Sequence, residues 1–331
     1  MPEWLTARLK DVWNSNAEPL ETMTQQTKRP ESKAGRVAQL LDPKVLTGLS
    51  NLELVARTVV DGVLMGLHRS PLFGFSQEFA EYRSYNEGDD LRYVDWNVFA
   101  RTGRTYIKRF KGETSSHLML LMDTSASMGY QSKTAAVSKL DYAKYLAASL
   151  AYLASRQMDA MGLILFDEQL REYRKPSSRS GQLPSIIHAI DAAQVSGGTE
   201  FSVPIEQMAA LGSKRGLVAV ISDFYTDTQS LLDAVRPMSI QGQDLVLFQI
   251  LDPEELTPDI QNSTLFEDAE SGASVEVSPE FMRREYPERI AAHIASIKEV
   301  AATMRADHVL LNSAKPLDEA LRQYLKFRQR R

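Results

Sequence analysis

The sequence contains no cysteine among its 331 residues. Disulfide bonds, iron–sulfur clusters and cysteine-ligated zinc are therefore excluded, and a reducing compartment such as the cytosol fits this composition. No apolar run reaches the roughly 18 residues that a membrane-spanning helix needs. The first residues also lack the uninterrupted apolar segment of a signal peptide. We therefore expect a soluble, cytoplasmic protein.

The chain is also short of positive charge, with a formal net charge of −5 at pH 7. This balance argues against a general nucleic-acid binder or a protein of anionic membranes. Local basic patches at Lys108, Arg109 and Lys111, or in the terminal "LKFRQRR", are still open to consideration. The terminal run ends a predicted helix, where positive charge suits the helix dipole. We expect no nucleic-acid partner.

The sequence divides into three regions. Residues 1–45 are mostly polar and predict a flexible tail, with a short amphipathic stretch that holds Trp4 and Trp13. This stretch is either a docking peptide or a helix that packs back onto its own domain. Residues 46–114 combine a helix expected over 46–67 with a small antiparallel module, whose strands are expected over 78–85, 91–100 and 105–110.

Residues 115–331 alternate apolar strands with helices, which indicates a parallel sheet covered on both faces. Strands are expected over residues 117–123, 160–166, 168–175, 216–223, 243–250 and 308–312, the third of them at an edge of the sheet. Helices are expected over residues 140–157, 181–193, 201–211, 228–239 and 288–305, the last starting at Pro287, and a further helix ends the chain. A hairpin turning at Ser271 and Gly272 precedes that start. The predicted fold class is α/β, with a Rossmann-like, mostly parallel sheet.

The stretch "LLMDTSASMGY" begins as a buried strand and changes character at Asp123. Ser125 and Ser127 follow at every second position. A second strand, "GLVAVIS", ends at Asp223, and the loop "SGGTEF" contains Thr199 after two glycines. Ligands of parallel α/β sheets bind beyond the carboxyl ends of the strands, so these oxygen-bearing side chains are expected at one edge.

These five side chains offer hard oxygen ligands and no nitrogen or sulfur. That set suits Mg²⁺, or alternatively Mn²⁺, because both ions prefer octahedral oxygen coordination. Each side chain also has a simpler interpretation, since Asp, Ser and Thr are common in turns and helix caps. A metal site and a set of polar turns are thus both compatible with the loops taken singly.

The motifs "DTSASM", "GGTEF" and "ISD", in this order, resemble the metal-ion-dependent adhesion site of von Willebrand factor type A domains. The resemblance implies that Ser125, Ser127 and Thr199 bind the ion directly. It implies that Asp123 and Asp223 bind it directly or through water. No position of the family pattern is missing here.

A longer pattern, "SQEFAEYRSYNEGDDLRYVDWNVFARTG" followed by "YIKRFKGE", resembles a bacterial family called domain of unknown function fifty-eight. The likeness covers roughly residues 46–327 and includes "LDPEEL" and "LFEDAESG". Its members are von Willebrand A-like proteins often encoded beside MoxR-type AAA+ ATPases. Many relatives carry N-terminal membrane helices, of which this sequence shows none.

The block "EYRSYNEGDDLRYVDW" gathers charged side chains around aromatic residues. Its spacing does not fit an EF-hand, and neighbouring carboxylates on a strand point in different directions, which disfavours a carboxylate-pair hydrolase. One interpretation is a turn whose Arg–carboxylate pairs fix the small module. The other is a partner-binding surface formed by Arg83, Asp89, Asp90, Arg92, Asp95 and Trp96.

The resemblance implies a non-enzymatic, metal-dependent protein-binding module. Its partner would offer an acidic side chain to the ion and would be a MoxR-type ATPase or a client protein. An alternative is a Mg²⁺-dependent hydrolase such as a phosphatase. The sequence shows no GxSxG elbow, HExxH or P-loop, and we expect His188 to be a packed histidine. A metal-free scaffold is the third hypothesis.

Overall fold

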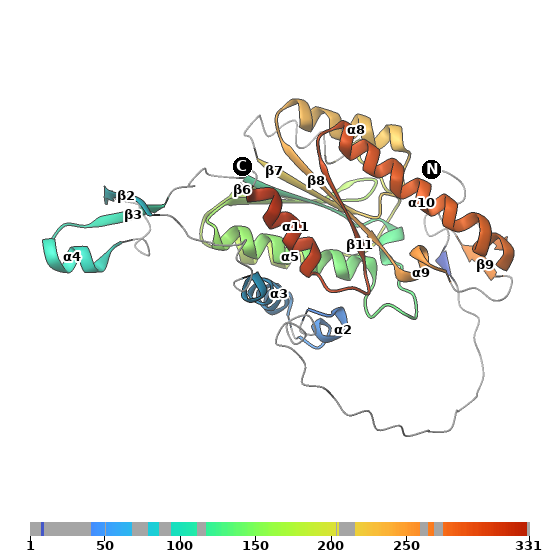
Figure 1. The fold of residues 1–331 in the computed structure, drawn as a ribbon, viewed down its shortest axis with the longest axis horizontal. Coiled ribbons are helices and arrows are strands. Elements are labelled where there is room, and N and C mark those ends of the chain that lie inside the picture. The colour runs from blue at the N-terminus through green and yellow to red at the C-terminus, as the bar shows by residue number, and fades with distance from the viewer. Residues whose placement is uncertain are drawn as a thin grey trace, which may run out of the picture.

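The structure is a computed structural model that describes residues 8–9, 41–49, 51–67, 79–85, 94–110, 117–202, 204, 216–258, 264–267 and 274–329. Figure 1 shows a central sheet between two layers of helices, with a small strand pair set apart from it. The predicted helix over residues 201–211 and the predicted turn at residues 271 and 272 lie largely outside the described ranges.

A six-stranded sheet in the order β11-β8-β7-β4-β5-β6 forms the centre of the molecule. The strands are β4 (His117–Asp123), β5 (Ala160–Phe166), β6 (Leu170–Ser177), β7 (Leu217–Ser222), β8 (Asp244–Leu251) and β11 (Asp307–Asn312). All neighbours pair in parallel except β5 and β6, which are antiparallel. Counted along the domain, this is the 3-2-1-4-5-6 order of doubly wound folds. The predicted Rossmann-like sheet is confirmed.

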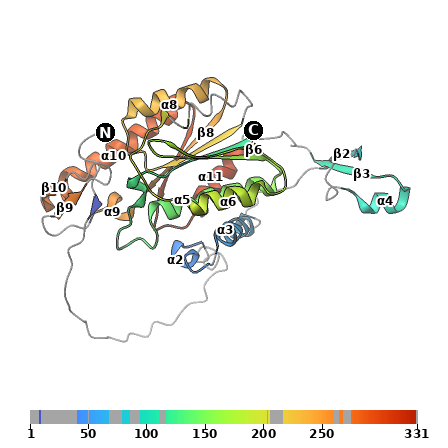
Figure 2. The same cartoon turned by 180° about the vertical axis from the view of Figure 1, so that it is seen from behind.

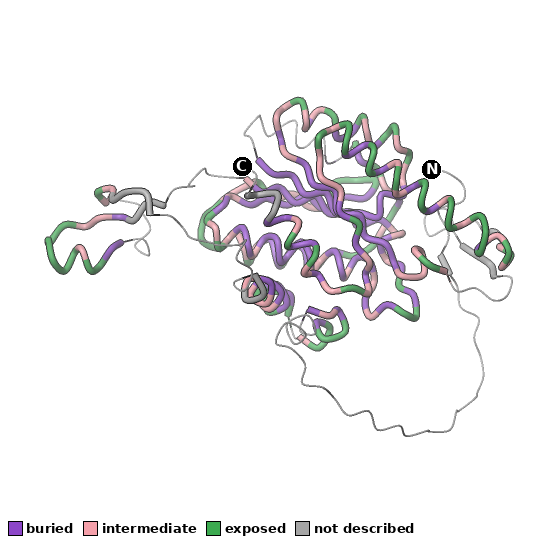
Figure 3. The backbone as a smooth tube through the Cα atoms, in the orientation of Figure 1, coloured by how far each residue is buried: buried purple, intermediate pink, exposed green. Residues whose placement is uncertain are grey.

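The four central strands β8, β7, β4 and β5 are buried on both faces, as their purple colour in Figure 3 shows, whereas the edge strands β6 and β11 are partly exposed. Successive residues of β4 point to opposite faces: Leu118 and Leu120 join one hydrophobic cluster, while Met119 and Leu121 join the other. This explains why the strands are apolar throughout rather than alternating.

Helices cover the two faces unequally. One face carries α5 (Lys139–Arg156), α6 (Gln182–Ala192) and α11 (Asp318–Gln329), and the other carries α8 (Thr228–Ile240) and α10 (Pro279–Thr303). Figure 2 shows α5 and α6 together beneath the sheet and α8 above it. Within the described ranges, no helix combines the length and the apolar character that a bilayer crossing requires.

The helix expected over residues 46–67 is two helices, α2 (Pro43–Leu46) and α3 (Leu52–Leu67). The Asp42 side chain caps α2 by accepting a hydrogen bond from the Lys44 amide, so the first helix begins before the predicted start. Buried residues of α3, among them Val55 and Val59, belong to the same core cluster as α5. The helix therefore packs against the main domain.

The small module contains β2 (Phe79–Ser84) and β3 (Tyr106–Phe110), paired antiparallel as predicted. The strand expected over residues 91–100 is wrong for its second half, because Trp96–Thr102 forms α4. Asp95 caps this helix through hydrogen bonds from the amides of Asn97 and Val98, and Gly103 ends it with a φ of 67°. These start and stop signals override the strand propensity of the aromatic residues.

The C-terminal part holds the expected hairpin strands, β9 (Thr264–Glu267) and β10 (Ser274–Val277). Within the tail, β1 (Arg8–Leu9) pairs with β9, so these two residues are extended rather than helical. The helix expected to start at Pro287 starts at Pro279, because Ser278 caps it and a proline fits the first turn. Pro287 thus lies inside α10. The short helix α9 (Pro253–Leu256) follows β8.

Candidate functional site

The predicted site lies at the carboxyl ends of two adjacent parallel strands. Asp123 is the last residue of β4, and Asp223 directly follows β7, which pairs with β4. The side chains of both aspartates are buried, each with an exposed fraction of 0%. The strand-end rule therefore brings them together as the sequence predicts.

The Asp123 carboxylate is held by hydroxyl and amide donors. Its Oδ1 accepts a hydrogen bond from the Ser125 amide at 2.8 Å, and its Oδ2 accepts one from the Ser222 hydroxyl at 2.6 Å. The hydroxyl oxygens of Ser125 and Ser127 lie 3.1 Å apart. Asp123, Ser125 and Ser127 thus form one compact group of oxygens at the tip of β4. The sequence reasoning did not single out Ser222.

The buried Asp123 carboxyl group is disfavoured in its charged form. Burial raises the pKa of Asp123 to about 7, and the negative charge of Asp223 adds to this effect. Hydrogen bonds from Ser222 and Ser125 act in the opposite direction without cancelling it. A cation bound beside Asp123 would favour the charged form of this carboxyl group.

Thr199 supplies the least expected feature of the site. Its hydroxyl oxygen is buried and has no hydrogen-bond partner within the part of the chain that the structure describes. Native proteins rarely leave a buried polar atom in this condition, because it costs about 1–3 kcal/mol. A ligand that accepts the oxygen's lone pair would satisfy it.

The loop that carries Thr199 is fixed against the ends of β4 and β5. The Ser196 amide donates to the Thr124 carbonyl at 2.9 Å, and the Ala126 amide donates to the Gly197 carbonyl at 2.9 Å. The Gly198 amide donates to the Glu168 carboxylate at 3.0 Å. These contacts bring the Thr199 loop to the loop of Ser125 and Ser127.

Asp167 anchors the same loop and was missed by sequence reasoning. It follows β5 directly, is fully buried, and accepts a hydrogen bond from the Ser196 hydroxyl at 2.6 Å. It also pairs with Arg171 and accepts a hydrogen bond from the Gln169 amide at 2.8 Å. The signal was available, since "LILFD" ends on a carboxylate just as "LLMD" does.

A buried lysine, Lys139, was also missed. Its Nζ lies 2.7 Å from Oδ2 of Asp223 and 2.7 Å from Oε1 of Glu255. Burial alone would lower the pKa of Lys139, but the negative charges of Asp223 and Glu255 and their hydrogen bonds raise it overall. The ammonium therefore stays charged beside the site.

His293 of α10 also lies near the site. It is buried, and its ring centroid lies 5.4 Å from that of Tyr225. Burial lowers the pKa of His293, and the charge and backbone of Asp223 only partly oppose this. His188, by contrast, is exposed on α6, so its prediction as a packed histidine is wrong. The helix positions on either side of His188 are buried, but the His188 side chain itself is exposed to solvent.

The five predicted oxygen donors fit a hard divalent cation on two observations. The Thr199 hydroxyl lacks a partner within the described residues, and the Asp223 charge opposes the ionisation of the buried Asp123 carboxyl. The described residues contain no cluster of three or more His, Cys, Asp or Glu side chains arranged to hold a metal, and three of the five predicted donors are hydroxyls.

The predicted partner-binding set is described only in part. Asp89, Asp90 and Arg92 lie outside the described residues. Asp95 is 5% exposed and caps α4, and Arg83 is half-buried. Trp96 is 58% exposed and meets the Phe99 ring edge-on, with centroids 5.9 Å apart. Helix α4 buries no residue and is coloured mostly as exposed in Figure 3.

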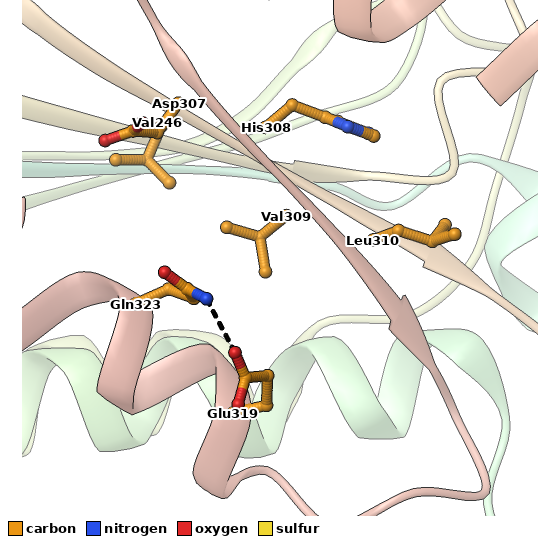
Figure 4. Close-up of a pocket in the computed structure, with 7 residues that line it drawn as sticks. All are labelled: Val246, Asp307, His308, Val309, Leu310, Glu319 and Gln323. Atoms are coloured by element: carbon orange, nitrogen blue, oxygen red, sulfur yellow. Dashed lines mark hydrogen bonds between the residues drawn. The ribbon is translucent and has the colours of Figure 1, made fainter. Parts of the chain in front are cut away.

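A separate pocket lies between β11 and α11. Figure 4 shows Glu319 and Gln323 of α11 facing Val309 of β11, with a hydrogen bond of 2.6 Å between the two polar side chains. The pocket is lined by Val246, Asp307, His308, Val309, Leu310, Glu319 and Gln323. It shares no residue with the predicted metal site.

Comparison with known proteins identifies relatives of the chain. The sequence model of the family described as "Protein of unknown function DUF58" matches residues 81–296. "Uncharacterized protein Rv1480" of Mycobacterium tuberculosis is 31% identical over 271 residues, which is 80% of this chain and 82% of the relative. "Uncharacterized protein Mb1516" of Mycobacterium bovis matches to the same extent.

Solved structures with a similar chain path have low sequence identity. The conserved hypothetical protein BatB from Bacteroides thetaiotaomicron is 15% identical, with a TM-score of 0.46, over 65% of this chain and 100% of that chain. The SpRpn10 VWA domain is 12% identical, with a TM-score of 0.38, over 63% of this chain and 95% of that chain. At these scores the fold assignment rests on the strand order itself.

Proposed function

The chain belongs to the DUF58 family of proteins of unknown function, and from that premise we propose that it is a non-enzymatic protein-binding module whose binding depends on a divalent cation. The observation that carries this proposal is the buried Thr199 hydroxyl, which has no partner among the described residues and lies in a loop that is hydrogen-bonded to the loop of Ser125 and Ser127.

The hydroxyl groups of Ser125, Ser127 and Thr199 would hold Mg²⁺, or alternatively Mn²⁺. Asp123 and Asp223 would bind it directly or through water. The ion would supply a positive charge and an open coordination position. Neutral hydroxyl donors leave most of that charge uncompensated, so an acidic side chain of a partner protein is the ligand that would complete the site.

The proposed partner is a MoxR-type AAA+ ATPase or one of its client proteins. The adaptor role, in assembly or maturation of another complex, rests on the family resemblance and is an argument by analogy. The cytoplasmic location and the lack of a nucleic-acid partner also stay predictions from the sequence.

Hydrolysis is the alternative function, and it needs a base or a nucleophile at the strand ends. His293 is one candidate base, but it packs against Tyr225 and lies close to the backbone of Asp223. Its Nε2 atom is buried and lacks a partner within the described chain. A group that reaches neither solvent nor an open cleft is a poor general base. We therefore favour binding over catalysis, and over a metal-free scaffold.

The first test is the thermal unfolding midpoint in Mg²⁺, in Mn²⁺ and in EDTA. Binding to the folded state alone raises the midpoint as the free metal concentration passes its dissociation constant. Wild type should show this rise and Asp123→Ala should not. Asp191→Ala removes an exposed carboxylate at the end of α6 and serves as the control that keeps the rise. A flat response of wild type up to millimolar metal would refute the metal site.

The second test identifies the partner. Wild type and Asp123→Ala are used to capture proteins from the native cytosol, each in Mg²⁺ and in EDTA. We expect an AAA+ ATPase or an acidic client to be retained by wild type in Mg²⁺ alone. Identical protein lists in all four conditions would refute metal-gated binding and direct attention to the Trp96 surface.

A further inference from the structure

Lys139 is the first residue of α5 and is fully buried, with an exposed side-chain fraction of 0%. Lysine is almost never buried to this extent unless its charge is paired. Here two carboxylates pair with it, Asp223 at 2.7 Å and Glu255 at 2.7 Å. The Glu255 side chain is only 15% exposed, so the group of three is largely shielded from bulk solvent.

The position of the ammonium is fixed from several sides. The ring of Tyr225 lies under it with its centroid 4.8 Å from Nζ. Ser138 caps the helix by accepting a hydrogen bond from the Asp141 amide, which fixes the start of α5. The second oxygen of Glu255 accepts a hydrogen bond from the Asp252 amide at 2.7 Å. Lys139 thus joins the loops that follow β4, β7 and β8.

Asp223 consequently has both carboxylate oxygens engaged within the protein. Oδ2 accepts the hydrogen bond from Lys139, and Oδ1 accepts one from the Tyr225 amide at 3.2 Å. Thr199 differs, since its hydroxyl has no partner within the described residues. Asp123 also accepts a hydrogen bond at each oxygen, but from neutral donors, so Asp223 differs from it in being paired with an ammonium group.

We propose that Lys139 is a positioning residue that keeps Asp223 from coordinating the cation directly and thereby weakens cation binding. This inference rests on the proposed function. Lys139 acts in two ways: its ammonium occupies Oδ2 of Asp223, and its positive charge repels a second cation at the same edge. Asp223 would then bind the ion only through water, which would leave a replaceable water for the partner's carboxylate.

The charge-neutral double variant Lys139→Met/Glu255→Gln tests the inference. Removing the lysine alone would leave two buried carboxylates unpaired, which strongly destabilises folds. The double variant removes one charge of each sign and leaves Asp223 without its ammonium. We expect the dissociation constant for Mg²⁺, measured by calorimetry, to fall by about ten-fold. Lys144→Met on the same helix, whose Nζ bonds only the Asp191 carbonyl among its described contacts, should leave the constant unchanged.

A double-mutant cycle with Asp223→Asn separates positioning from a purely structural role. If Lys139 keeps Asp223 out of direct coordination, Asp223→Asn should weaken Mg²⁺ binding by only about two- to three-fold in wild type. It should weaken binding by about ten-fold more in the double variant, where Asp223 binds directly. Water-proton relaxation by bound Mn²⁺ should report fewer bound waters in the double variant than in wild type.

An equal effect of Asp223→Asn in both backgrounds, with equal water counts, would overturn the inference while leaving the metal site intact. If wild type bound no Mg²⁺ in the same calorimetric experiment, the proposed function would fail, and the inference with it. Whether wild type binds Mg²⁺ in this experiment distinguishes the two failures.

Discussion

At the scale of single residues, the hydroxyl groups of Thr124 and Thr199 lead to opposite predictions about the stability of the folded protein. Thr124 Oγ1 is buried and donates to the Phe166 carbonyl at 3.0 Å, whereas Thr199 Oγ1 is buried without a partner in the described chain. A buried hydroxyl that is hydrogen-bonded to the protein stabilises the folded state. A buried hydroxyl without a partner destabilises the folded state until a ligand binds it.

Thr199→Val should therefore change the free energy of unfolding by less than about 0.5 kcal/mol without metal, or raise it. It should also remove the stabilisation by Mg²⁺. The matched change Thr124→Val should cost about 1–2 kcal/mol, because it leaves the Phe166 carbonyl with one bond fewer. Urea unfolding with and without Mg²⁺ measures both. A large loss for Thr199→Val without metal would show that the hydroxyl serves the fold.

We expect the titration of His308 to make the free energy of unfolding depend on pH. Burial lowers the pKa of His308 to about 4, helped by the positive charge of Lys298. The folded state thus favours the neutral ring, and the stability this adds is complete above the unfolded pKa of about 6.5. It is lost as the pH falls from about 6.5 towards 4.

His308→Asn should flatten this decline, because Asn does not titrate. Urea midpoints at pH 7, 5.5 and 4 for wild type and the variant give the comparison. The Gln249 side chain, which lies 3.0 Å from Nε2 of His308, remains in place as a hydrogen-bond partner. Parallel declines in the two proteins would assign the pH dependence to other groups.

At the scale of elements, the sequence predicted which carboxylates lie at the ends of strands. It did not predict which side chains pack against them. The rule for parallel sheets placed Asp123 and Asp223 at one edge from their positions after apolar runs. Lys139 follows no such rule, because "SKLDY" indicates only a capped helix start. Its burial depends on α9 bringing Glu255 to it across more than a hundred residues. Such long-range pairs are set by tertiary packing and leave no local pattern.

Helix α4 gives the prediction at this scale. It buries no residue, so its ends stabilise it. Asp95→Ala removes the acceptor of two backbone amides and should lower the free energy of opening of α4 by about 1 kcal/mol. Amide hydrogen exchange across residues 96–103 should then be about five-fold faster. Asn97→Ala, an exposed change within the helix, should slow exchange or leave it unchanged. Unchanged exchange in Asp95→Ala would show that another contact holds the helix.

At the scale of the whole molecule, the core around the sheet includes residues of α3. The sequence places residues 46–114 in one unit, and this boundary stays a prediction. The structure shows α3 sharing a core cluster with α5, while β2, β3 and α4 lie apart from the sheet. Hydrophobic spacing predicted a helix here, but it showed neither the division into α2 and α3 nor which partner buries the apolar face.

Val59→Ala tests whether α3 unfolds with the sheet. Val59 is fully buried, and its loss should cost about 1.5–3 kcal/mol in a single cooperative transition. Leu54→Ala, on the exposed side of the same helix, should cost less than about 0.5 kcal/mol. Circular dichroism and tyrosine fluorescence should give the same midpoint. A separate early transition in Val59→Ala would show that α3 is an independent unit.

The packing of α3 makes the strand-pair module an insertion within a continuous fold. The chain leaves the core after α3, builds β2, α4 and β3, and returns at β4. A protease that cut on both sides of the module would release it, yet the fragment with α3 would stay bound to the fragment with the sheet through side-chain packing, the Arg156–Asp61 ion pair and the β1–β9 pairing. The two pieces would behave as a noncovalent complex, and a shorter linker could replace the module without breaking the core.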